Sequence, residues 1–227
     1  MSVVVVLLRK AEFNSRESVI RNAFRGSTFD IHYMDGTTNS LEDAIKYSHS
    51  KGPKKYSIVI SDTMTTQIRS EEMEKFVKDT VRTMTKEKID LCYLNRYLDQ
   101  CQMMTPVDND DPTTDLYRTY APRGDDCILY SPNARKELMK KHKGRDICEL
   151  VLEGEFNALA TTPSIFHFSL DCATSIEHYE RSCECVPLQK LAAPVESGTN
   201  TSFIYFFFAV LLIIIATWAL LYVGPKK

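Results

Sequence analysis

Charged and amide side chains follow three apolar segments of this chain, and their types suit a phosphorylated ligand. Arg9 and Lys10 come directly after the run VVVVLL. Asp62 follows YSIVIS, and Asn95 with Arg96 follows IDLCYL. Guanidinium and ammonium groups bind phosphate oxygens, and a carboxylate can hold a divalent cation against them. Neither a Gly-x-Gly-x-x-Gly fingerprint nor a Walker-type loop is present, which argues against a standard dinucleotide or P-loop site.

Strand-like and helical segments alternate along the first hundred residues, and they would position these side chains. Apolar or alternating runs predict strands at 3–8, 29–33, 56–60 and 89–94. Helices are predicted between them, with starts at Asn14 and Ser40 and with helical spacing of apolar residues over 70–86. This order calls for an α/β fold with a mostly parallel sheet between helices. Ligands bind beyond the carboxyl ends of the strands of such sheets, where Arg9, Asp62 and Asn95 would meet.

A less regular region follows. Prolines and aspartates without visible period fill 101–125, which predicts a long loop acting as a lid or binding segment. The elements expected after it are a strand at 127–130, a helix capped by Ser131, a helix from Asp146 to about Ala160 and a last strand at 164–170.

The stretch 203–223 predicts a membrane anchor. It has 21 residues without a charge, and a helix of that length spans about 30 Å, the thickness of the hydrocarbon core of a bilayer. The membrane bilayer is therefore an expected partner. The predicted parts are an α/β domain at 1–170, a Cys-containing segment and stalk at 171–202, the transmembrane helix at 203–223 and a short tail at 224–227.

The expected localisation follows from the ends of the chain and its charge. Val3–Leu8 has no cationic segment before it and does not resemble a secretory signal. A single C-terminal anchor then predicts a tail-anchored protein with a cytosolic head. Lys226 and Lys227 favour the opposite orientation, because positive residues tend to stay inside, so the topology is left open. The net charge of −2 provides no basic field, so nucleic acid is not an expected partner.

The seven cysteines are odd in number and show no disulfide-scaffold rhythm, which favours reduced thiols. A zinc site built on Cys172, His178, Cys183 and Cys185 is a minor alternative, since Cys-x-Cys lacks the usual spacing of zinc ligands.

Several longer motifs occur in a recognisable order. VVVVLLRKAEFNSRESVIRNAF is followed by FDIHYMDG, then by YSIVISDTM, and later by ILYSPNARKELMKK. This order resembles glycosyltransferase family 25, which includes lipooligosaccharide and collagen galactosyltransferases. Arg9 and Arg16 match Arg-rich residues after the family's first strand, and Asp62 matches one place of its acidic motif. The resemblance covers roughly residues 1–170.

The resemblance implies a nucleotide-sugar-transferase fold of the GT-A type. It also implies transfer of a hexose from a nucleotide-diphosphate sugar, helped by Mn²⁺ or Mg²⁺. In this chain it assigns Asp62 to the metal, and Arg9 and Arg16 with Asp62 to the nucleotide end of the donor. Asp125 or Asp126 is a candidate base for the acceptor hydroxyl, on chemistry and location alone.

The chain departs from the family pattern at two places. The family's early Asn-Leu is Leu7-Leu8 here, and its acidic motif is reduced to Ser61-Asp62. One carboxylate is a poor cage for Mg²⁺ or Mn²⁺. Two functions are therefore kept: a membrane-anchored hexosyltransferase, and a non-catalytic structural or scaffold protein whose head binds protein partners. By analogy, a large DNA virus, whose particles contain membrane proteins, is a plausible source for either.

Overall fold

The computed structural model describes residues 2–9, 17–36, 38–95, 105–108, 115–120, 122, 124, 126–141 and 144–168. All of them belong to one compact unit, Met1–Val186. The predicted stalk, the helix at 203–223 and the possible zinc ligands Cys172–Cys185 lie outside the described residues. Within those ranges, no helix is both long and apolar enough to cross a membrane.

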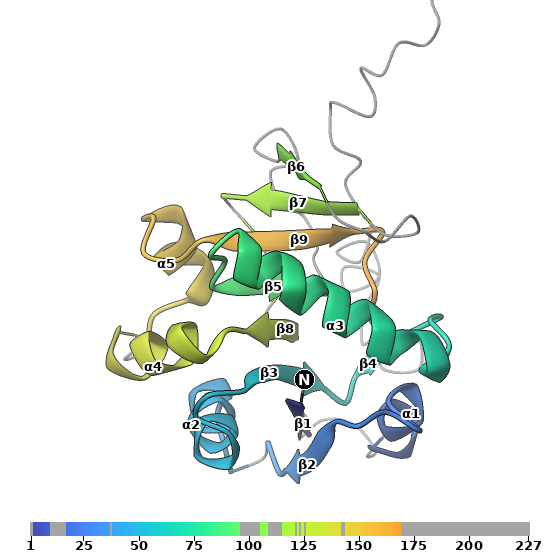
Figure 1. The fold of residues 1–227 in the computed structure, drawn as a ribbon. Coiled ribbons are helices and arrows are strands. Elements are labelled where there is room, and N and C mark those ends of the chain that lie inside the picture. Colours follow the sequence, from blue (N-terminus) through green and yellow to red (C-terminus); the bar gives the residue numbers. More distant parts are fainter. Residues whose placement is uncertain are drawn as a thin grey trace, which may run out of the picture. The chain divides into compact units, whose positions relative to one another are not determined.

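An eight-stranded sheet forms the centre of the described unit (Figure 1). Its strands, in sheet order, are β2 (Asp30–Met34), β1 (Val3–Leu8), β3 (Tyr56–Ser61), β8 (Cys127–Tyr130), β5 (Leu91–Tyr93), β9 (Ala158–Thr162), β7 (Asp115–Thr119) and β6 (Thr105–Val107). The helices are α1 (Glu17–Ala23), α2 (Leu41–Lys51), α3 (Ser70–Lys86), α4 (Pro132–Lys141) and α5 (Ile147–Leu152). The short strands β4 (Met64–Thr65) and β10 (His167–Phe168) pair separately.

The α/β class is confirmed, and the sheet is mixed. β2, β1 and β3 are parallel neighbours, as are β5 and β9. β8 lies between β3 and β5 and is antiparallel to both, so β3 and β5 run in the same direction. β7 is antiparallel to β9 and to β6. The carboxyl ends of β1, β2, β3, β5 and β9 therefore lie along one edge of the sheet, together with the beginning of β8.

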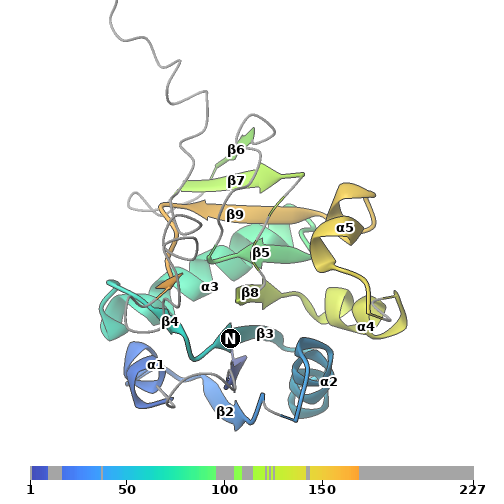
Figure 2. The same cartoon turned by 180° about the vertical axis from the view of Figure 1, so that it is seen from behind.

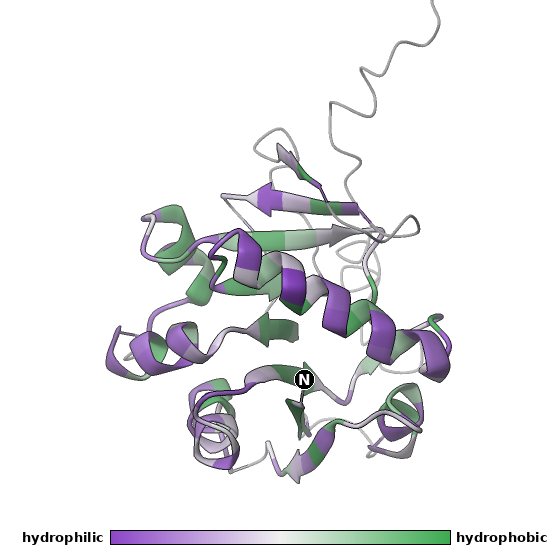
Figure 3. Ribbon diagram, in the orientation of Figure 1, coloured by the Kyte–Doolittle hydropathy of each residue, from purple (hydrophilic) through white to green (hydrophobic). Residues whose placement is uncertain are grey.

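Helices cover both faces of the sheet because alternate side chains of its strands point to opposite sides. Val3, Val5 and Leu7 of β1 pack in a layer with α1 and α3. The residues between them pack with α2, α4 and α5. Figures 1 and 2 show α3 crossing one face, and Figure 3 shows hydrophobic residues in the central strands and hydrophilic ones along α3 and α4. Burial on both faces explains the continuous apolar run of β1.

Local signals located several elements correctly. The strands predicted at 3–8 and 127–130 and the helix at 70–86 match β1, β8 and α3. Ser40 caps α2 in a capping box: its Oγ accepts a hydrogen bond from Asp43 N at 3.2 Å, and Asp43 Oδ2 accepts one from Ser40 N at 2.9 Å. Ser131 Oγ likewise accepts from Ala134 N at 3.1 Å, at the start of α4. These features depend on neighbouring residues, which is why sequence patterns find them.

The prediction of a continuous loop at 101–125 was wrong, because β6 and β7 lie within it. β6 is the last strand of the sheet, and β7 is its only neighbour among the described strands. Because one side of an edge strand is unpaired, β6 can contain Pro106, which has no N–H to donate. β7 is held by its pairing with β9 on the other side. The pairing of β7 with β9 joins segments about 40 residues apart, which no local pattern shows. The prolines and aspartates of this region also lack the alternating pattern of a strand.

The prediction of a helix from Asp146 to Ala160 was also wrong beyond Leu152. Asp146 does cap α5, with its Oδ1 accepting from Cys148 N at 2.8 Å. Gly154, at φ +76°, then turns the chain, and Ala158–Thr162 becomes β9. The strand expected at 164–170 is reduced to the two-residue β10 among the described residues. β9 forms because β5 and β7 pair with it on either side, a non-local effect.

Candidate functional site

Arg9 directly follows β1, and its backbone is held at the end of β2. Its N–H donates to Met34 O at 3.0 Å. Its carbonyl oxygen faces Gly36, where an added Cβ would lie 1.8 Å from that oxygen. Only glycine allows this close approach. The Asp35-Gly36 turn therefore fixes the position of Arg9.

The Arg9 side chain is partly buried, and its Nε–H makes no hydrogen bond among the described residues. Leaving a buried polar group unpaired costs about 1–3 kcal/mol, and more when the group is charged. An anion bound at this edge would remove that cost. Arg9 is therefore a cation whose surroundings fit a phosphate-bearing ligand.

Asp62 and Asp126 come to the same edge from β3 and β8. Asp62 N donates to Leu8 O at 3.0 Å, which places Asp62 beside the end of β1. Ser61 N donates to Asp126 O at 2.7 Å. The two aspartates are 1% and 9% exposed, respectively. The structure thus brings together the backbones of Arg9, Asp62 and Asp126, while Arg16 and Asp125 lie outside the described residues.

Asn95 completes this group at the end of β5 and is 1% exposed. Its Nδ2 donates to Phe166 O at 2.8 Å, which fixes the orientation of the carboxamide. Its Oδ1 is buried and accepts no hydrogen bond from any described residue. The site therefore contains an unpaired donor on Arg9 and an unpaired acceptor on Asn95.

Buried hydroxyl groups lie at the ends of β3 and β9, and sequence reasoning missed them. Ser61 Oγ and Thr63 Oγ1 are hydrogen-bonded at 2.7 Å. Three further buried hydroxyl residues follow the segment that was predicted as a helix: Thr161, Thr162 and Ser164. Pro163 was the signal that could have located them, since a proline disfavours helical backbone in the residue before it.

The described residues do not fit a metal held by the protein. Among them, no three His, Cys, Asp or Glu side chains form a group that could bind a metal ion. Mg²⁺ and Mn²⁺ need several oxygen ligands, and Asp62 is almost fully enclosed.

Thiol chemistry is also disfavoured at this edge. Burial raises the pKa of the Cys127 thiol well above its usual value, and the charge of Asp126 and the nearby Cys92 raise it further. Burial likewise raises the pKa of Cys92. Both cysteines are therefore protonated near neutral pH, whereas the thiolate is the reactive form.

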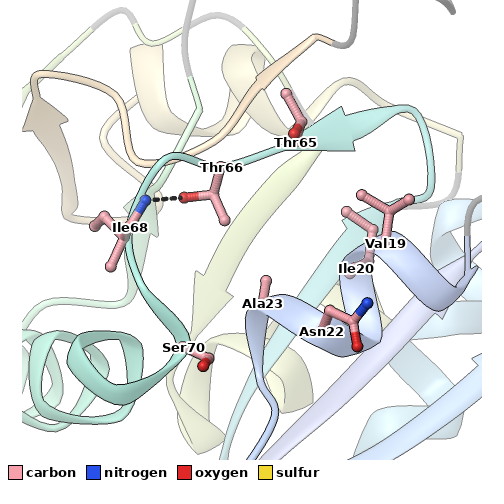
Figure 4. Close-up of a pocket in the computed structure, with 8 residues that line it drawn as sticks. All are labelled: Val19, Ile20, Asn22, Ala23, Thr65, Thr66, Ile68 and Ser70. Carbon is pink, nitrogen blue, oxygen red and sulfur yellow. Dashed lines mark hydrogen bonds between the residues drawn. The ribbon is translucent and has the colours of Figure 1, made fainter.

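A pocket of about 200 Å³ lies between α1 and the segment from β4 to the start of α3 (Figure 4). Its lining residues are Val19, Ile20, Asn22, Ala23, Thr65, Thr66, Ile68 and Ser70. Thr66 Oγ1 donates to Ile165 O at 2.7 Å and accepts from Ile68 N at 3.2 Å, which fixes one wall. The pocket is smaller than the roughly 300–1,000 Å³ typical of drug-sized ligands, so it would hold part of a ligand rather than a whole nucleotide sugar.

No protein-family model matches this sequence, and no curated protein matches it. Many solved structures resemble the fold, among them the following three. Apo UDP-glucose pyrophosphorylase is 10% identical with a TM-score of 0.40, and the match covers 80% of this chain and 79% of that one. CMP:2-keto-3-deoxy-manno-octonic acid synthetase complexed with CTP is 10% identical with a TM-score of 0.41, covering 72% and 92%.

The third is a glycosyltransferase involved in the glycosylation of the major capsid of PBCV-1. It is 9% identical with a TM-score of 0.43, and the match covers 79% of this chain and 96% of that one. At these values the likeness concerns only the arrangement of an α/β sheet and its helices, and it says nothing of activity.

Proposed function

We propose that the described unit is a glycosyltransferase-like domain that binds a nucleotide-diphosphate sugar at the carboxyl edge of its sheet. The observation that carries the proposal is Arg9, a guanidinium held at the end of β1 whose buried Nε–H has no acceptor among the described residues. A diphosphate supplies the negative charge and the acceptor oxygens that this group lacks.

Three polar side chains of the edge have a role in this proposal. Arg9 binds the diphosphate, and Asn95 Oδ1 accepts a hydrogen bond from an N–H or O–H of the base or sugar. Asp126 lies at the same edge and is a candidate to take the proton of an acceptor hydroxyl in a hexosyl transfer. Binding is proposed to depend on Arg9 and Asn95 rather than on a metal held by the protein.

The proposal also places this domain at a membrane. The uncharged stretch 203–223 supports a single C-terminal anchor in that membrane.

A specific observation favours a second candidate, a non-catalytic scaffold that uses the same fold to bind protein partners. Asp62 is 1% exposed, and no group of metal-binding side chains is present in the described part of the chain. Such a protein would not respond to nucleotides.

The test is thermal unfolding of the full chain in detergent with a panel of nucleotide diphosphates, each with and without Mn²⁺. A ligand at about 100 times its Kd adds about 2.7 kcal/mol of stability, which raises the Tm by several degrees. We expect such a shift without Mn²⁺, and its loss in Arg9→Gln and Asn95→Leu. Arg25→Gln, which changes an exposed arginine after α1, is the matched control and should keep the shift.

Three results would contradict the proposal in different ways. No shift with any nucleotide would favour the scaffold. A shift that persists in Arg9→Gln would place the ligand elsewhere. A shift that requires Mn²⁺ and disappears in Asp62→Asn would show that a metal bound through Asp62 is essential.

A further inference from the structure

Positive charge is concentrated on α2, the turn after it and α4. Residues 41–55 carry four lysines against Glu42 and Asp43, and α4 carries Arg135 and three lysines against Glu137. By contrast, α3 carries equal numbers of acidic and basic residues, and the whole chain has a net charge of −2. Basic residues therefore outnumber acidic ones in this region, although the chain as a whole is slightly acidic.

Some of these lysines are neutralised by neighbours and some are not. Lys46 lies 2.7 Å from Glu42, and Lys140 lies 2.9 Å from Glu137. Lys141 pairs with Glu155. Four lysines make no ion pair with any described residue, and together they are called the basic face: Lys51, Lys54, Lys55 and Lys136.

The buried side chain of Arg135 joins the two parts of the basic face. It is 0% exposed, and its Nη2 donates to Gly52 O at 2.8 Å and to Lys55 O. Its Nη1 donates to Ser48 Oγ at 3.3 Å. These contacts fix the turn that carries Lys54 and Lys55 against α4, so the lysines project from a rigid base.

Arg135 also adds charge beneath the basic face, because its partners among the described residues are carbonyl and hydroxyl oxygens rather than carboxylates. Burial lowers its pKa to about 10, which leaves it protonated at neutral pH. The same positive charges act on His49 of α2. Its pKa is lowered first by burial and then by the charges of Arg135 and Lys136.

We propose that the basic face binds an anionic membrane surface through the net negative charge of its lipid headgroups. Charge complementarity carries this inference, since a lysine near such a surface strengthens association by about fivefold. The expected anchor at 203–223 would hold the head near the bilayer. The 34 residues between Phe168 and Phe203 reach about 110 Å when extended, so the anchor does not prevent this face from turning to the lipid.

Docking through this face leaves the nucleotide site open. The turn at 52–55 leads into the beginning of β3, whereas Asp62 follows the end of β3. Six residues of strand separate these points by about 20 Å. The two surfaces lie at opposite edges of the sheet, so lipid docking and nucleotide binding can be tested separately.

The experiment is hydrogen–deuterium exchange of the full chain in lipid nanodiscs of two compositions. One contains phosphatidylcholine alone, and the other contains about 30% phosphatidylserine as the source of negative charge. We expect exchange in peptides covering 41–55 and 132–141 to slow at least threefold only in the anionic discs. The protection should disappear at about 0.5 M salt, which screens surface charge.

Two charge-reversal variants make the test specific. Lys51→Glu, Lys54→Glu and Lys136→Glu together should abolish the protection. Lys75→Glu, Arg82→Glu and Lys86→Glu change the same charge at exposed positions of α3 and should leave it intact.

Equal exchange in the two kinds of disc, equal loss in both variants, or failure of the chain to associate with anionic discs would overturn the proposal. The Tm shift with nucleotide diphosphates, measured on the same variants, reports on the carboxyl edge and should be unchanged by either set of substitutions.

Discussion

Gly36 is required by the carbonyl oxygen of Arg9 rather than by its own backbone angles, since it is not among the residues with positive φ. The close approach of the β2 end to Arg9 leaves no room for a side chain. Arg9 in turn presents a buried, unpaired Nε–H at the edge where Asn95 presents an unpaired Oδ1. At the scale of single residues, the candidate site is thus a backbone contact that positions a cation, plus one fixed carboxamide.

Gly36→Ala should therefore destabilise the protein and weaken its response to nucleotides. The added methyl group would collide with backbone, so we expect a loss of about 2–3 kcal/mol in the free energy of unfolding, measured by urea denaturation. Thr38→Ala, an exposed change two residues later, should have little effect. An unchanged urea midpoint in Gly36→Ala would show that the β2 end does not approach Arg9 in this way.

At the scale of secondary-structure elements, α2 and α4 are joined by a buried arginine. Arg135 of α4 donates hydrogen bonds to backbone carbonyls of the turn after α2. This arrangement brings positive groups of α4 close to His49 of α2. Burial of the ring, and then the charges of Arg135 and Lys136, favour the neutral imidazole in the folded state, so the pKa of His49 lies below its ordinary value. Its contribution to stability is complete above the unfolded pKa of about 6.5 and is lost as the pH falls through the lower folded pKa.

His49→Gln should reduce the acid sensitivity of the fold. Between about pH 7.5 and 5.5, the wild-type protein should lose stability relative to this variant, because only the wild type must charge an imidazole beside Arg135 and Lys136. Urea unfolding at constant ionic strength measures the difference. Ser50→Ala, at the next and exposed position, should follow the wild type. A stability difference between wild type and His49→Gln that does not change with pH would refute this account.

At the scale of the whole molecule, the sheet separates two surfaces. Arg9, Asp62, Asn95 and Asp126 lie where the parallel strands end. The basic face lies at the other end of the strands, where β3 begins. This division suits a head that meets a nucleotide at one end and a membrane at the other.

The full chain should remain in the membrane fraction after an alkaline carbonate wash. Leu212→Arg with Ile214→Arg should release it, because each arginine near the centre of a membrane helix disfavours insertion by about 2.5–3.5 kcal/mol. Leu188→Arg with Leu191→Arg adds the same charge before the anchor and should not release the protein. Release of the wild type by the wash would contradict the assignment of 203–223 as a transmembrane helix.

The sequence by itself determined the parts of this protein that depend on neighbouring residues. The period and composition of β1 and α3, the caps at Ser40 and Ser131, and the placement of Arg9, Asp62 and Asn95 after strands could all be read from local patterns. Strand ends in a parallel arrangement meet at one edge, so the general location of the site followed as well.

Only the tertiary structure decided which distant segments pair. Ala158–Thr162 has little strand-forming character, yet it becomes β9 because β5 and β7 flank it. β8 enters antiparallel between β3 and β5, and this direction brings Asp126 to Ser61. The unpaired atoms of Arg9 and Asn95 likewise depend on what surrounds them. Pairing and burial are sums over contacts remote in sequence, and no local period encodes them.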